Sequence, residues 1–72
     1  MKREEATALL KELLYYNLVQ PSYVHLKRNE HGHFDLVIKC DCDVIELRKF
    51  IVAKDLALLV DKEHGTCRIY KP

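Results

Sequence analysis

The sequence predicts an α+β domain in which two helices pack on one face of a four-stranded, mainly antiparallel sheet. Three observations lead to this prediction. Apolar residues recur at helical spacing in two segments, and they alternate at strand spacing in others. The tripeptide Glu-His-Gly occurs twice, at 30–32 and 63–65, each time between two strand-like runs. We therefore expect a single domain, residues 1–72, in the order α-β-β-α-β-β.

Size and composition narrow the functional classes. A chain of 72 residues buries only roughly 60% of its unfolded surface, so a partner chain would add useful stability. Apolar residues make up 49% of the chain and charged residues 32%, which is typical of a globular domain. The net charge of +1 argues against a large electrostatic footprint for duplex DNA or membrane. Without a signal-like segment, and with three cysteines expected to be reduced, we predict a cytoplasmic protein.

The first helix is predicted over residues 3–18. An apolar stripe recurs there every three or four positions, at Ala6, Leu9, Leu10, Leu13 and Leu14. Pro21 follows this segment, and the residue before a proline is pushed out of the helical region. The stripe predicts one buried helix face.

The first hairpin is predicted from strands over 22–28 and 33–40. Gly32 suits the left-handed position of a three-residue loop that consists of the first Glu-His-Gly. This loop sets Leu26 opposite Leu36 and therefore predicts that both face the same side of the sheet.

The second half of the chain allows two interpretations. Residues 43–54 are expected to form a helix with Asp43 as N-cap. Residues 56–71 are then expected to form a second hairpin that pairs Leu59 with Ile69 and Leu58 with Tyr70. The alternative is a longer second helix that reaches His64, which gives the order α-β-β-α-β.

The predicted register leaves one sheet face free of helices. Its apolar members are expected to be Val37, Leu56, Leu58 and Val60, and such a group is typical of a protein contact. We therefore expect a small non-enzymatic interaction module that self-associates through this face, with a homo-oligomer or another protein as partner. The full candidate set is Tyr23, His25, Lys27, Val37, Lys39, Leu56, Leu58, Val60, Arg68 and Tyr70.

The alternative function is binding of single-stranded RNA or DNA. Sheets that present aromatic rings among basic side chains stack single-stranded bases. In this chain the rings would be those of Tyr23 and Tyr70, among Lys27, Lys39 and Arg68.

No set of residues predicts catalysis, a cofactor, a metal or membrane insertion. The pairs His31/His33 and Cys40/Cys42 hold zinc-type ligands, but a strand of about 23 Å would separate them. Cys67 and Cys40 are expected to be small buried residues rather than nucleophiles. The chain has only two glycines, so a glycine-rich phosphate loop is excluded, and no paired carboxylates lie in an apolar setting. We expect a protein that is not an enzyme.

Overall fold

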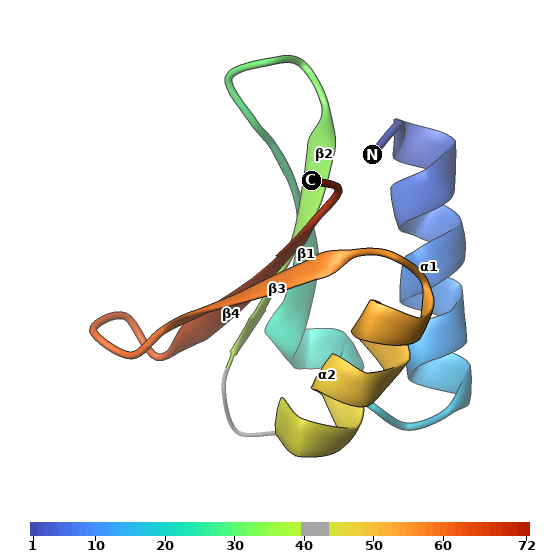
Figure 1. The fold of residues 1–72 in the computed structure, drawn as a ribbon, viewed down its shortest axis with the longest axis vertical. Helices are drawn as coiled ribbons and strands as arrows, with labels where there is room; N and C mark the ends of the chain where they lie inside the picture. The colour runs from blue at the N-terminus through green and yellow to red at the C-terminus, as the bar shows by residue number, and fades with distance from the viewer. Residues whose placement is uncertain (40–43) are drawn as a thin grey trace.

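The computed structural model describes residues 1–39 and 44–72, which form two helices on one face of a four-stranded antiparallel sheet (Figure 1). This confirms the predicted fold class. The elements are α1 (Arg3–Tyr15), a 3-10 turn (Pro21–Tyr23), β1 (Val24–Arg28), β2 (Phe34–Lys39), α2 (Val44–Ala53), β3 (Ala57–Asp61) and β4 (Thr66–Tyr70). The strands lie in the order β1-β2-β4-β3, so β1 and β3 are the two edges of the sheet.

Helix α1 ends three residues earlier than the predicted residue 18. Asn17 takes the left-handed conformation, with φ of 57°. The amide of Leu18 then donates to the carbonyl of Leu13, which is a common way to close a helix. The sequence pattern missed this stop because Leu18 continues the apolar series, although its backbone has already left the helix.

Helix α2 ends in the same way, and this ending decides between hairpin and long helix. Asp55 is left-handed, with φ of 59°, and the amide of Leu56 donates to the carbonyl of Ile51. The chain therefore turns before Ala57, and the second hairpin is the correct alternative. The predicted N-cap, Asp43, lies outside the described residues.

The first hairpin has the predicted register. Leu26 pairs with Leu36 and Val24 pairs with Ile38. Gly32 is left-handed with φ of 77°, and the amide of Asn29 donates to the carbonyl of His33 across a three-residue loop. The Asn29 side chain strengthens the loop, because its Oδ1 accepts from the amides of His31 and His33 at 2.9 and 3.0 Å.

The predicted register of the second hairpin is wrong by one residue. Leu58 pairs with Ile69, and Leu59 pairs with Arg68. Asp61 pairs with Thr66, which leaves a four-residue loop, 62–65, around the second Glu-His-Gly. The tripeptide thus fills the whole first loop but only part of the second. Because strand side chains alternate between faces, this single extra residue turns every side chain of β3 to the other face.

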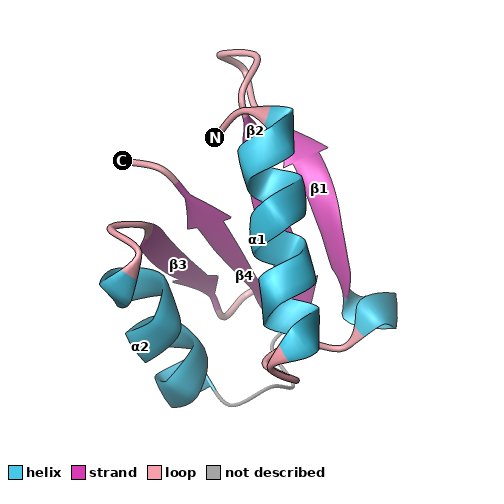
Figure 2. Cartoon of the chain, turned by 90° about the vertical axis from the view of Figure 1, so that its right-hand side faces the viewer, coloured by secondary structure: helices cyan, strands magenta, loops and turns pink. Residues whose placement is uncertain are grey.

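The core lies between the sheet and the two helices. Leu36, Ile38 and Ile69 point inward from the central strands β2 and β4, and Leu13 and Leu47 meet them from the two helices. Helix α1 packs against β2 and α2 packs against β3. Figure 2 shows this division, with α2 on the β3 side of the molecule and α1 nearer to β1.

The two ends of the chain lie together, at the end of the molecule away from α2 (Figure 1). Met1 is part of the core, and its carbonyl accepts a 2.7 Å hydrogen bond from the amide of Phe34 at the start of β2. Lys71 reaches Glu5 of α1, with 3.6 Å between Nζ and Oε2. These contacts hold both ends of the chain beside the sheet.

The register of β3 can be tested with two neighbouring substitutions. Leu58→Asp places a carboxylate against the core and should lower the free energy of unfolding by about 2 kcal/mol or more. Leu59→Asp places the same group on the opposite face and should cost less than about 1 kcal/mol. Urea unfolding at low protein concentration measures both. The reverse order of the two effects would contradict the register.

Candidate interaction surfaces

Seven of the ten predicted surface residues do share the sheet face away from the helices. The strand pairings place His25 beside Val37, and Val37 beside Arg68. The complete group is Tyr23, His25, Lys27, Val37, Lys39, Arg68 and Tyr70. We call this group the free sheet face.

Leu56, Leu58 and Val60 do not belong to the free sheet face, and their predicted position is wrong. The observed pairing sets Leu58 beside Ile69 and Val60 beside Cys67, both of which are buried on the helix side. Leu56 and Leu58 pack against the core. Their place on the outer face is taken by Leu59, which is 49% exposed and pairs with Arg68. The free sheet face is consequently more polar than the sequence predicted.

Two contacts between a basic side chain and a tyrosine ring lie on the free sheet face. The Lys39 ammonium lies 5.4 Å from the centre of the Tyr23 ring, and the Arg68 guanidinium lies 5.5 Å from that of Tyr70. Contacts of this length are attractive because the ring face carries negative charge density. Each tyrosine therefore lies beside a basic group, as the nucleic-acid alternative requires.

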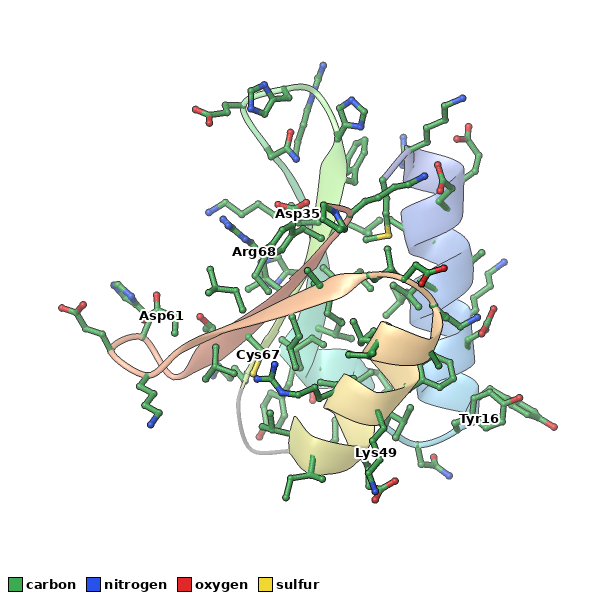
Figure 3. All side chains as sticks on the ribbon, in the orientation of Figure 1. Tyr16, Asp35, Lys49, Asp61, Cys67 and Arg68 are labelled. Atoms are coloured by element: carbon green, nitrogen blue, oxygen red, sulfur yellow. The ribbon has the colours of Figure 1, made fainter. Side chains whose placement is uncertain are left out.

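A buried carboxylate lies in the same face. Asp35 is only 5% exposed, its Oδ1 accepts from Asn29 Nδ2 at 3.4 Å, and its Oδ2 lies 3.8 Å from Arg68 Nε. Figure 3 shows Asp35 and Arg68 side by side on the sheet. Because Asp35 offsets part of the charge of Arg68, the basic character of this face is reduced where Tyr70 lies.

An apolar depression of the described surface lies on α2. Its volume is about 580 Å³, and its walls are Val44, Ile45, Arg48, Lys49, Val52 and Ala53. Ile45 and Val52 are 68% and 61% exposed, although both are large apolar residues. We call the apolar side chains of this group, Val44, Ile45, Val52 and Ala53, the α2 strip. Around the helix, Arg48 and Lys49 lie between these apolar residues. Lys49 Nζ pairs with Glu46 Oε1 at 3.6 Å.

Ile45 and Val52 of the α2 strip point away from α1. On the opposite side of the helix the Phe50 ring meets Tyr16 at 5.7 Å, and Lys54 Nζ lies 2.7 Å from Glu12 Oε2 of α1. At 3.6 residues per turn, Ile45 and Val52 lie roughly 140° and 160° around the helix from Phe50. Since α2 packs on β3, the edge strand, the strip faces outward on the β3 side of the molecule.

Sequence reasoning missed the α2 strip, although the sequence carries a signal for it. A helix with one buried face needs apolar residues on only about half of its circumference. In α2 the residues Val44, Ile45, Leu47, Phe50, Ile51, Val52 and Ala53 surround most of it. Leu47 and Ile51 are buried, so the others exceed what one core contact requires.

The β3–β4 loop brings three potential metal ligands together. The ligand atoms of Asp61, Glu63 and His64 lie within 4.8 Å of one another, and all three side chains are exposed. Figure 3 places Asp61 at the far end of the projecting hairpin. His64 Nδ1 is 2.7 Å from Asp61 Oδ2, and the His64 amide donates to Asp61 Oδ1 at 3.2 Å. These hydrogen bonds account for the closeness of Asp61 and His64 as part of the loop structure.

Hydrogen bonds from the His64 side chain and amide hold the pKa of Asp61 below its ordinary value. A carboxylate with a lowered pKa stabilises the fold above its unfolded-state pKa, and this contribution is lost as the pH falls through the folded-state pKa. We expect His64→Ala to raise the pKa of Asp61 toward its ordinary value. Carboxyl NMR titration measures it, and His31→Ala, in the other hairpin loop, is the control that should leave it unchanged.

Cys67 is fully buried on β4, as predicted, but it is disulfide-bonded rather than a free thiol. The expectation of a reduced thiol is therefore wrong for this residue. The other two cysteines, Cys40 and Cys42, lie outside the described residues. The predicted inward position of Cys40 therefore stays a prediction. Since disulfides are rare in reducing compartments, the cysteines do not support the predicted cytoplasmic location.

Comparison with protein-family models, with curated proteins and with solved structures found no match for this chain. Neither helix in the described ranges, 1–39 and 44–72, has the length and apolar character needed to cross a membrane.

Proposed function

We propose that this chain is a small, non-enzymatic protein-interaction module that self-associates through the side of the molecule formed by α2 and β3. The observation that carries the proposal is the α2 strip, in which Ile45 and Val52 expose well over half of their surface. Single exposed apolar residues are ordinary, but two large ones side by side at an apolar depression are typical of a protein contact.

The free sheet face is a poorer surface for self-association than the sequence predicted. Self-association through that face depended on Leu56, Leu58 and Val60, and the register of β3 turns all three toward the helices. The face keeps the apolar side chains of Val37 and Leu59, set among charged groups. Burying those charges would cost free energy.

The self-association can be tested by adding a charge to the α2 strip. Val52→Lys should weaken the association at least about tenfold, because an ammonium replaces a buried apolar contact. Val37→Lys, on the free sheet face, is the matched control and should have little effect. Sedimentation equilibrium over a wide range of protein concentration measures both. A wild-type chain that stays monomeric at hundreds of micromolar would contradict the proposal.

Binding of single-stranded nucleic acid is a second candidate, through the free sheet face. Its support is the position of Tyr23 and Tyr70 on one face, each beside a basic side chain. Bases stack on such rings, and the basic groups attract the phosphates. The near-neutral net charge and the buried carboxylate of Asp35 weigh against high affinity.

This second candidate predicts that fluorescently labelled oligonucleotides bind at low salt and dissociate as salt rises. Tyr70→Ala should reduce the affinity at least about fivefold, because it removes a stacking surface. Tyr15→Ala is the control, since Tyr15 is an exposed tyrosine on α1, away from the sheet. Equal losses in the two variants, or no binding at low salt, would remove this candidate.

A further inference from the structure

The two edges of the sheet differ in how well they are protected against pairing with another strand. Edge β1 carries His25, Lys27 and Arg28 and follows a proline, and these are features that oppose pairing. Edge β3 has the sequence Ala-Leu-Leu-Val-Asp, and its only charged side chain is that of Asp61, at the end of the strand. An apolar edge strand without interior charges offers its free backbone groups to a partner strand.

The exposed edge and the α2 strip lie on the same side of the molecule. Helix α2 packs on β3 and lies on the β3 side of the molecule (Figure 2), and Ile45 and Val52 lie on the side of α2 away from α1. A partner strand added to β3 would therefore bring its own covering helix against the strip. The apolar edge and the apolar helix side, which are separate observations, point to one interface.

From this juxtaposition we infer that two copies of the chain pair their β3 strands antiparallel across a two-fold axis at Leu59. The inference rests on the proposed function and specifies its partner and geometry. It gives a continuous sheet of eight strands, four from each copy. The α2 helices of the two copies then lie on the same side of this sheet, close to the two-fold axis.

A second copy fits the edge because the strand is complementary to itself. Leu59 is the midpoint of the five-residue strand, so an axis there pairs all five residues. Leu58 then lies opposite Val60 of the second copy, both on the helix face. Leu59 lies opposite its own copy on the outer face, and Asp61 lies opposite Ala57. Within the two paired strands no like charges face each other, and every paired side chain shares a face with its partner, as antiparallel pairing requires.

An interface of sufficient area needs both the β3 edge and the α2 strip. A stable interface takes about 800 Å² from each partner, which is about one-sixth of the 5147 Å² that this chain exposes. Five paired residues supply only a narrow ribbon. The exposed side chains of Ile45 and Val52 in the α2 strip add apolar surface.

The test uses cysteines introduced at two positions of β3. In the inferred register Leu59→Cys faces its own copy within reach of a disulfide, whereas the two copies of Ala57→Cys lie roughly 13 Å apart. Under mild oxidation we expect at least about tenfold more disulfide-linked dimer from Leu59→Cys than from Ala57→Cys on a non-reducing gel. The unsubstituted protein measures the background from the native cysteines.

The experiment separates failure of this geometry from failure of the proposed function. Sedimentation of the unsubstituted protein reports whether it associates at all. If it associates but the two variants cross-link equally, the β3 pairing is overturned and the interaction module stands. If it stays monomeric and neither variant cross-links above background, both are overturned. Preferential cross-linking at position 59 together with concentration-dependent association supports both.

Discussion

The length of the β3–β4 loop is the constraint on which the outer surface of this domain depends. Four residues separate Asp61 from Thr66, and that number decides which side chains of β3 meet the helices. With one residue fewer, Leu56, Leu58 and Val60 would lie in solvent and Leu59 would lie in the core. The loop is closed locally, by the Asp61 carboxylate accepting from the amide of His64 and by Gly65 in the left-handed region. A few exposed polar contacts thus set the composition of a distant surface.

The first half of the chain was predictable because its local and long-range signals agree. The loop at 30–32, the alternation in β1 and β2, and the stripe in α1 all indicate one arrangement. The second hairpin was predictable as an element but not in its register. Pairing Leu59 with Ile69 and pairing Leu58 with Ile69 both bury leucine. The repeated Glu-His-Gly favoured the wrong frame, because identical tripeptides need not occupy identical loop positions.

The wrong register of β3 also explains why Leu56, Leu58 and Val60 were assigned to the wrong face of the sheet. Positions such as His25, Lys27 and Arg68 are placed correctly because their strands pair as expected. The α2 strip needed information on which side of α2 faces α1, and this is fixed by the contact of Phe50 with Tyr16. From the sequence alone, the additional apolar residues of α2 are taken for core residues and not for a second surface.

The position of the chain ends has a practical consequence for how this domain can be combined with others. Met1 is anchored by its carbonyl to the start of β2, and both ends leave the fold at the end away from α2. A polypeptide fused at either terminus therefore starts at the end of the molecule away from α2. The domain can accordingly be joined to a larger protein, or repeated in tandem, with the α2 strip still accessible.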